Sequence, residues 1–485
     1  MINLIKNELT KIFHKKAIYI VLVITLAFTV LNCILGKIFF DDASYFYEDT
    51  ESIKESMNSL DRSNPEDNEI YVSLAAELQS IELSKKYEDS SWQNYIIFYK
   101  GQDIIADMIR AEGTPEYAIY KRAYDNFLQK LENDNWKTFA QEELDEINSK
   151  IAELESLSED GQSETSLISL RDSKQALEWR LEKNIAYGNT ARSNVLEEWA
   201  TAKVELRDFA EQEKTKKLTY SQQREKQQLE GNIKLYEYAI ENDIDDKYEL
   251  TQINDQTAFA SSVDDELVEN HYEYSIFIII AVVIIAGTTI SEESNKGTIK
   301  LLLVKPYKRT KILVAKFISC FIVLLTFYIA TTLFQGIVGG CVYGFNNYLG
   351  KVITYNFNTG TVETISTFKY LLLTGIAIMP YFLLIMTLAF AISTIANNSP
   401  TAIAIPLLGT MAAGIINQLA IYHKKAQFLK YFVTPNWDLR IYLFGRLSEF
   451  EPISLPFSIA ICLIYFLVMV VASIYVFRKR DIKNV

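Results

Sequence analysis

The chain has 485 residues, and its formal net charge of −13 is the sum of two very different parts. Residues 41–270 contain 52 acidic and 25 basic side chains and carry −27, whereas the rest of the chain is rich in apolar runs and carries +14. This pattern excludes a basic nucleic-acid-binding surface, and we expect no nucleic-acid partner. The four cysteines and three histidines lack the spacing of metal ligands, so we expect no bound metal and no thiol chemistry.

The first 40 residues predict an interface helix followed by a membrane span. Residues 1–16 have an amphipathic pattern that suits a cytoplasmic helix on the membrane surface. Its apolar face contains Ile2, Ile5, Leu9, Ile12 and Phe13. Residues 17–40 are long enough and apolar enough to cross a bilayer, and the lysines before them place the N-terminus inside. A cleaved signal peptide is the alternative, but the apolar run shows no convincing small-residue cleavage site.

Residues 41–270 predict a large extracytoplasmic helical domain. Residues 64–67 (Asn-Pro-Glu-Asp) are typical of a turn. From Gln141 onward, leucines and isoleucines recur at the spacing of a coiled-coil seam, which predicts an antiparallel helical hairpin with its loop at 158–166. Further helices are expected around 195–209 and 221–240.

The aromatic residues of this domain have two interpretations. Ordinary helix packing with solvated acidic faces is the favoured one. The other is a groove for a cationic peptide, because tyrosine and tryptophan offer large amphipathic contact surfaces and the charge of −27 attracts cations. The candidates for such a groove are Trp92, Tyr95, Tyr99, Trp136, Trp179 and Trp199.

The second half of the chain predicts five more spans, at 271–290, 312–343, 370–396, 401–420 and 455–477. A cytoplasmic loop at 291–311, an outer loop at 344–369 and an outer amphipathic segment at 421–454 connect them, and residues 478–485 form a cytoplasmic tail. We therefore predict an all-α integral membrane protein with six transmembrane helices and both termini in the cytoplasm. The basic residues of 421–454 oppose the positive-inside tendency, which leaves the topology of that segment open.

The loop at 291–311 and the start of the next span read SEESNKGTIKLLLVKPYKRTKILVAK. Its middle predicts a short amphipathic helix that ends at Pro306. The order of an acidic pair, Gly-Thr, a leucine run, proline, Arg309 and Lys316 resembles the ABC-2 type permeases, which are the membrane subunits of ATP-driven exporters. The alternative is an ordinary basic loop that only follows the positive-inside tendency.

The resemblance implies that this loop contacts a separate ATPase subunit and transmits its motion. Glu292 and Glu293 would offer anionic contacts, Gly297 and Thr298 would open the coupling helix, and Lys316 would anchor the third span at the interface. The full set of implied coupling residues is Glu292, Glu293, Gly297, Thr298, Lys300, Pro306, Arg309 and Lys316. The chain contains no G-x-x-x-x-G-K-[ST] motif. We therefore expect a non-enzymatic subunit that binds no cofactor, with ATP and magnesium held by the partner.

The expected function is export of a peptide, drug-like or lipid-like substrate across the cell membrane, or self-protection against an antimicrobial peptide. The expected partners are a P-loop ATPase, a second permease copy or a paralogue, and the lipid bilayer. The alternative is an envelope receptor or secretion-accessory protein of the phage-infection-protein type, through which ATP would not be coupled. A peptide-sensing permease of the MacB kind fits less well because those proteins have four spans.

Overall fold

The computed structural model describes residues 1–41, 50–88, 91–133, 135–157, 162–188, 190–244, 268–297, 307–345, 351–396, 398–422, 424–445, 447 and 453–479. The chain divides into two compact units. We call the first the span unit; it comprises residues 1–38, 216–231 and 255–485. The second, which we call the insert unit, comprises residues 39–215 and 232–254.

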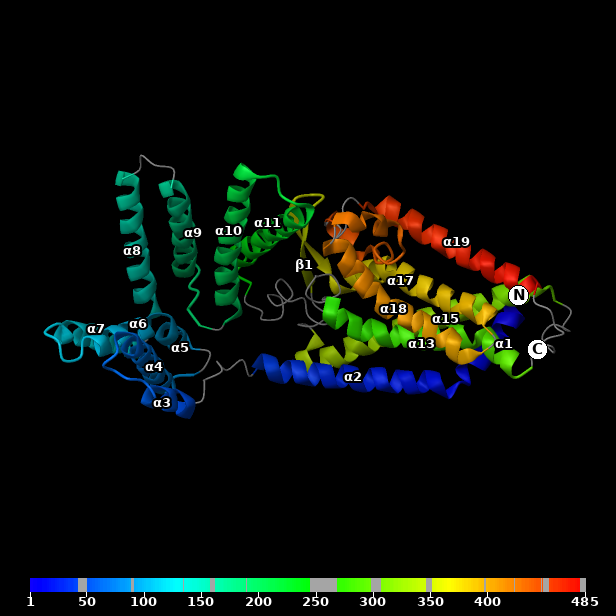
Figure 1. The fold of residues 1–485 in the computed structure, drawn as a ribbon, viewed down its shortest axis with the longest axis horizontal. Helices are drawn as coiled ribbons and strands as arrows, with labels where there is room; N and C mark the ends of the chain where they lie inside the picture. The colour runs from blue at the N-terminus through cyan, green and yellow to red at the C-terminus, as the bar shows by residue number, and fades with distance from the viewer. Residues whose placement is uncertain are drawn as a thin grey trace. The chain divides into compact units, whose positions relative to one another are not determined.

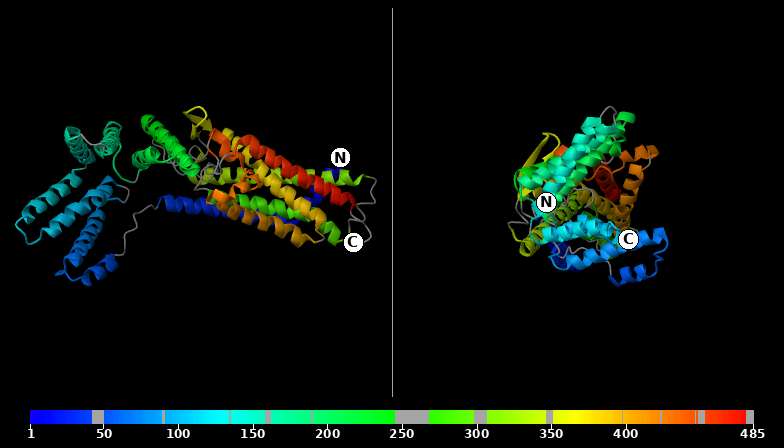
Figure 2. Two further views of the ribbon diagram at one scale, coloured as in Figure 1. Left: turned by 45° about the horizontal axis from the view of Figure 1, so that its top comes forward. Right: turned by 90° about the vertical axis from the view of Figure 1, so that its left-hand side faces the viewer.

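Six helices of the span unit are long and apolar enough to cross a bilayer. They are α2 (Lys16–Asp41), α13 (Val268–Asn295), α15 (Arg309–Tyr343), α17 (Thr367–Ile395), α18 (Ser399–Tyr422) and α19 (Leu455–Lys479). The prediction of six helices of membrane-crossing length is therefore confirmed. The last five lie side by side (Figures 1 and 2).

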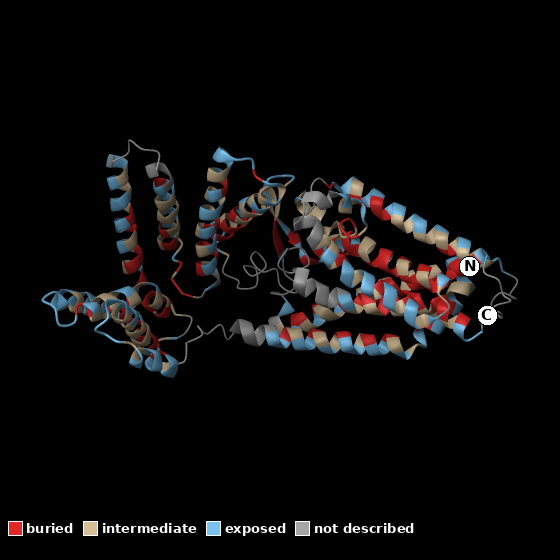
Figure 3. Cartoon of the chain, viewed as in Figure 1, coloured by how far each residue is buried: buried red, intermediate tan, exposed pale blue. Residues whose placement is uncertain are grey.

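Helix α13 lies at the centre of this bundle. Within its span 67% of the residues are buried, against 17% in the spans of α18 and α19. Helix α13 contacts α15, α17 and α18, and its side chains Val283, Ala286 and Ile290 are completely buried. Figure 3 shows the same distribution: many residues of α13 and α17 are buried and drawn in red. A displacement of α13 would therefore change its packing against three neighbouring helices.

Helix α1 (Ile2–Phe13) packs against α15. Its predicted apolar face is divided between two environments. Ile12 is buried, and Ile5 and Leu9 are half-buried, whereas Ile2 and Phe13 are exposed. One part of the face therefore packs on protein, and the adjoining part remains free for a membrane surface. Glu8, which lies one turn before Ile12, is also buried.

The segment that we expected to be an outer loop, 344–369, contains a β-hairpin. Strands β1 (Lys351–Asn356) and β2 (Thr361–Ser366) are antiparallel, with Lys351 opposite Ser366 and Asn356 opposite Thr361. Both strands are rich in β-branched residues, and Gly360 adopts a positive φ of 68° in the turn between them. The prediction of a helical architecture is confirmed for the described residues apart from this hairpin.

Part of the segment expected to belong to the outer domain packs within the span unit. Residues 220–231, the first part of α11 (Tyr220–Glu241), approach the β-hairpin so closely that a Cβ at Gly231 would lie 2.6 Å from Phe357. The Oε1 atom of Gln227 also accepts a hydrogen bond of 3.0 Å from the backbone N–H of Leu447.

The segment before α19 contains two 3₁₀ turns, η3 (Lys424–Tyr431) and η4 (Leu439–Gly445). One of its cations is internally neutralised, because Arg440 Nε donates to Asp438 at 2.9 and 3.1 Å. Phe428 and Tyr431 are exposed. Aromatic side chains of this kind favour the membrane–water interface.

The insert unit is built from helices. They are α3 (Thr50–Asn58), α4 (Pro65–Ser84), α5 (Trp92–Ile96), the π-helix η1 (Ile97–Gly101), α6 (Gln102–Arg110), α7 (Tyr117–Glu132), α8 (Trp136–Leu157), α9 (Gln162–Glu182), α10 (Ala191–Thr215) and the remainder of α11. The expected turn at 64–67 is instead the start of α4. Asn64 accepts a hydrogen bond from the Glu66 N–H, and Pro65 occupies the first helical position, where its missing N–H has no cost.

Most tryptophan side chains of the insert unit are buried in its core. Trp92, Trp136 and Trp199 are each less than a tenth exposed. Trp92 and Trp136 pack with Leu144, Ile147 and Leu177 in one cluster, and Trp199 packs against Trp179. These three tryptophans therefore belong to the packing of the unit and are not available to line a groove.

The approach of α13 to α18 depends on one glycine. A Cβ at Gly287 would lie 2.8 Å from the backbone oxygen of Ala402, and the backbone cannot rotate away as a side chain could. We expect Gly287→Ala to destabilise the span unit by about 1–3 kcal/mol. Thermal unfolding in detergent measures this, with Gly409→Ala on α18 as the control because nothing lies within 4 Å of a Cβ there. Equal melting temperatures for the two variants would contradict the close approach.

Candidate functional site

Three helices contribute charged side chains to one buried cluster. Lys316 of α15 donates to Glu8 of α1 at 2.6 Å and to Glu293 of α13 at 2.9 Å. Lys11 of α1 contacts the same two carboxylates, at 2.9 Å to Glu8 and 3.0 Å to Glu293. Two lysines and two glutamates thus alternate in a closed ring. We call Glu8, Lys11, Glu293 and Lys316 the buried ion quartet.

The quartet is arranged so that no charge is buried without an opposite charge beside it. The side chain of Lys316 is only 1% exposed, and the Glu8 and Glu293 side chains are 10% and 17% exposed. Removing a charge from water costs several kcal/mol unless a partner and hydrogen bonds compensate it. The requirement for charge balance therefore holds α1 against the bundle in one register.

The titration of Glu8 and Lys11 reflects this balance. Burial by itself raises the pKa of Glu8, but the Lys316 and Lys11 ammonium groups outweigh it and hold the pKa below its ordinary value. Burial likewise lowers the pKa of Lys11, yet the hydrogen bonds and charges of Glu8 and Glu293 raise it overall. Both groups are therefore held in their charged forms.

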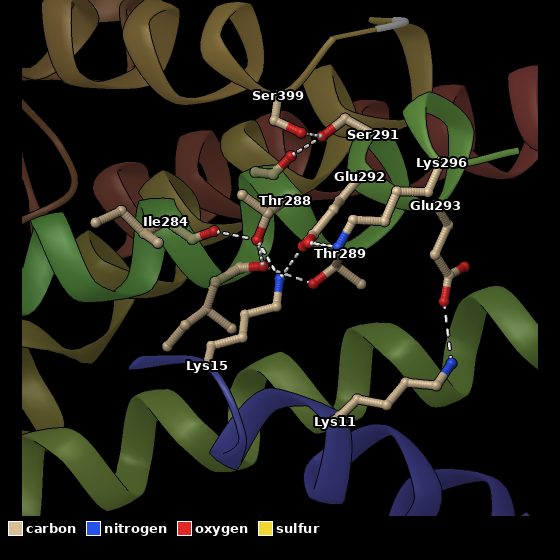
Figure 4. A network of polar contacts seen from close by, with 12 residues as sticks. Lys11, Lys15, Ile284, Thr288, Thr289, Ser291, Glu292, Glu293, Lys296 and Ser399 are labelled. Carbon is tan, nitrogen blue, oxygen red and sulfur yellow. Dashed lines mark hydrogen bonds and ion pairs between the residues drawn. The ribbon is translucent and has the colours of Figure 1, made fainter. Parts of the chain in front are cut away.

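A second set of contacts joins α13 to the segment between α1 and α2 (Figure 4). Lys15 donates to Thr288 Oγ1 at 2.6 Å and to Glu292 Oε2 at 2.7 Å. Glu292 also pairs with Lys296 at 2.6 Å, and the Lys296 side chain is 66% exposed. The two adjacent glutamates therefore differ, since Glu293 faces the buried quartet and Glu292 lies near the surface.

Hydroxyl groups connect the same end of α13 to α17 and α18. Ser393 Oγ accepts hydrogen bonds from the backbone N–H groups of Ile290 and Ser291, at 3.1 and 3.0 Å. Ser291 Oγ in turn donates to Gly287 O at 2.6 Å and shares a hydrogen bond of 3.1 Å with Ser399 Oγ. Residues 287–296 are consequently the place where α1, α15, α17 and α18 are all bonded to α13. We call this segment the α13 hub.

The structure brings three of the eight predicted coupling residues into this region. Glu292, Glu293 and Lys316 participate as described above, and the Lys316 side chain points into the quartet and not toward an interface. Gly297 follows α13 with a positive φ of 66°. Arg309 begins α15 and donates to the backbone oxygen of Arg478 at the end of α19, at 3.0 Å. Thr298, Lys300 and Pro306 lie outside the described residues.

The sequence pattern did not identify Glu8, Lys11 and Lys15 as members of the site. The available signal was the position of Glu8, a lone acid four residues before Ile12 on the apolar side of a short helix. Nothing local identifies its partner, because Lys316 is 308 residues away. Among the described residues, no three His, Cys, Asp or Glu side chains are grouped so as to hold a metal ion.

The comparisons find sequence similarity to one protein family and to two proteins of Bacillus subtilis. Residues 247–483, just under half of the chain, match the model of a family described as a protein of unknown function, DUF2705. The chain is 29% identical over 206 residues to the uncharacterized protein YhcI of Bacillus subtilis. This matched region covers 42% of this chain and 64% of YhcI. It is 28% identical over 207 residues to the uncharacterized membrane protein YdbK of Bacillus subtilis. This matched region covers 41% of this chain and 76% of YdbK. No solved structure matches.

The quartet predicts a strong effect of removing its most buried charge. Lys316→Met leaves two buried carboxylates with one lysine, so we expect a loss of about 3–5 kcal/mol in unfolding free energy. The double variant Glu8→Gln/Lys316→Met restores the charge balance and should recover part of that loss. Denaturation in detergent measures both, and Lys296→Met, which removes an exposed lysine of the neighbouring pair, should stay near the wild type. A double variant less stable than Lys316→Met would contradict the charge-balance argument.

The lowered pKa of Glu8 predicts a pH dependence of the docking of α1. Because the folded pKa lies below the ordinary value of 4.5, the contribution of Glu8 is complete above pH 4.5 and is lost as the pH falls through the folded value. The labelling rate of Ile12→Cys, a buried position, divided by that of Ile2→Cys, an exposed position on the same helix, should therefore rise below that pH, since the thiolate fraction falls alike for both. The background carries Cys341→Ser, since Cys341 is exposed. Adding Glu8→Gln should remove most of the pH dependence; an unchanged profile would show that another group titrates.

Proposed function

We propose that the chain is the permease subunit of an ABC exporter, which moves a peptide, drug-like or lipid-like substrate outward with ATP hydrolysed by a separate subunit. The observation that carries the proposal is the buried ion quartet together with the α13 hub. Helix α13 ends and α15 begins on either side of residues 296–308, and the quartet joins both helices to α1. A force on this loop would reach α1, α13 and α15 together.

The α13 hub extends the same connection to the rest of the bundle. The hydroxyl contacts join α13 to α17 and α18, and Arg309 joins the start of α15 to the end of α19. Packed interiors transmit displacement because their elements shift as units and do not deform continuously. ATP-driven movement of a docked subunit would therefore rock several spans at once, which is what an alternating-access exporter requires.

The surface beside the loop would provide the docking contacts. Tyr307 is 42% exposed, Lys308 is exposed at the start of α15, and Lys296 is exposed at the end of α13. An acidic patch on an ATPase subunit would complement these lysines. In this proposal Glu293 and Lys316 act inside the permease and connect its helices, while Lys296, Tyr307 and Lys308 meet the partner.

The remaining parts of the proposal concern assembly and location. The permease would work in the cell membrane with a second copy or a paralogue, both termini in the cytoplasm and the insert unit outside. Six helices of membrane-crossing length and a relative described as a membrane protein support the membrane location. The resemblance of the 291–316 sequence to ABC-2 permeases supports the ATPase partner.

Co-purification from the native membrane tests the proposal. The tagged full chain is extracted in mild detergent, and the proteins that come with it are identified. We expect a stoichiometric P-loop ATPase with the wild type, and a severalfold smaller yield of it with Lys308→Glu because reversed charge would repel an acidic docking surface. Reversal of Glu293 is unsuitable because it would break the quartet as well.

The matched control is Lys369→Glu, another exposed lysine in the first turn of a span helix, α17. It should retain the ATPase. Equal yields with Lys308→Glu and Lys369→Glu would remove the docking role from this surface. Secretion components in place of an ATPase would instead support the envelope-receptor or secretion-accessory alternative.

A further inference from the structure

A cluster of tyrosines and carboxylates lies where five segments of the insert unit meet. The Tyr95 and Tyr187 rings are stacked with centroids 5.6 Å apart, and Tyr99 lies 5.5 Å from Tyr95. The Tyr187 hydroxyl donates to Glu143 at 3.1 Å. These residues come from α5, η1, α8 and the segment before α10, and Glu197 of α10 completes the cluster through its contact with Arg180 of α9, at 3.2 Å.

The inner side of the cluster already holds a guanidinium group. Arg180 is 4% exposed, its guanidinium carbon lies 4.1 Å from the centroid of the Tyr187 ring, and it donates to Ser193 at 3.1 Å and to Glu197 at 3.2 Å. A cation over a tyrosine ring with a carboxylate beside it is an established means of holding arginine. A tyrosine ring with a carboxylate beside it therefore already holds one guanidinium group inside this protein.

On its outer side the cluster exposes a tyrosine ring and two carboxylates to solvent. Tyr99 is 55% exposed, and the Glu143 and Glu197 side chains are 21% and 38% exposed. Partial burial raises the pKa of Tyr99, and the charges of Glu143 and Glu197 raise it further, whereas the charge of Arg180 opposes them. The exposed ring of Tyr99 and the two partly exposed carboxylates therefore belong to one cluster, connected through Tyr95, Tyr187 and Arg180.

The backbone beneath Tyr99 is held firmly. Tyr99 belongs to the π-helix η1, and such wide turns occur frequently at functional sites. Ile96 and Ile97 are completely buried, and a Cβ at Gly101 would lie 2.9 Å from the Phe127 ring. The exposed ring is thus carried on a segment that the core fixes on both sides, which reduces the entropic cost of binding a ligand.

We propose that the exposed face of Tyr99, with Glu143 and Glu197, binds a guanidinium or ammonium side chain of a cationic peptide. A cation–π contact supplies the local attraction, and the charge of −27 carried by residues 41–270 draws a cationic peptide toward the unit. Lys100, which pairs with Glu143 at 3.1 Å, would be displaced or shared when the peptide arrives. The inference deepens the proposed function, on which it rests for identifying the peptide as cargo.

Fluorescence anisotropy of the full chain in nanodiscs of phosphatidylcholine tests the proposal. The probes are a labelled tetra-arginine peptide and a tetra-citrulline peptide, which has nearly the same shape but no charge. We expect the arginine peptide to bind at least tenfold more tightly. Tyr99→Ala should weaken its binding about five- to tenfold, and Tyr99→Phe should stay within about twofold because the ring face remains.

Tyr117→Ala is the matched control, since Tyr117 is a partly exposed tyrosine elsewhere in the same unit, at the start of α7. It should bind as the wild type does. The proposal is overturned if Tyr99→Ala binds the arginine peptide unchanged, if the two peptides bind equally, or if neither binds. The measurement needs no ATP and no partner, so its failure would leave the exporter proposal standing, and a missing ATPase would leave this site standing.

Discussion

The need to balance charge in a buried setting governs the span unit. Lys316 cannot be 1% exposed unless acids surround it, and the acids come from two other helices, Glu8 on α1 and Glu293 on α13. Lys11 then balances the second negative charge. Any shift of one helix relative to the others would separate these pairs, so a single electrostatic condition determines the placement of three elements.

Packing and hydrogen bonds around the quartet connect the helices that it joins to α17 and α18. Gly287 allows α13 and α18 to approach until their backbones are nearly in contact, and Ser291, Ser393 and Ser399 add hydrogen bonds across the same level. Polar groups in an apolar bundle are costly unless they are bonded, so they favour one arrangement of the helices over neighbouring ones. Such an arrangement suits a device that passes motion from a loop to several spans.

The insert unit solves a related problem by other means. Arg180 is as buried as many core residues, and it is accommodated by an aromatic ring, a hydroxyl group and one carboxylate. Its surroundings therefore need both tyrosines and acids at the junction of the helices. The strongly acidic composition of the unit belongs mostly to solvated helix faces, but at this junction acids perform a structural role and also meet the surface beside Tyr99.

Local sequence determined the elements that depend on composition over a short window. Apolar runs of about 20 residues suffice to predict each span, and leucines and isoleucines at coiled-coil spacing predict α8 and α9. The β-branched runs of β1 and β2 carried a signal too, which the polar residues between them obscured. The tertiary structure alone decided which charges meet. Glu8 and Lys316 are 308 residues apart, and Tyr95, Glu143 and Glu197 lie on different helices, so their pairing depends on how buried surfaces pack and on no pattern within one segment.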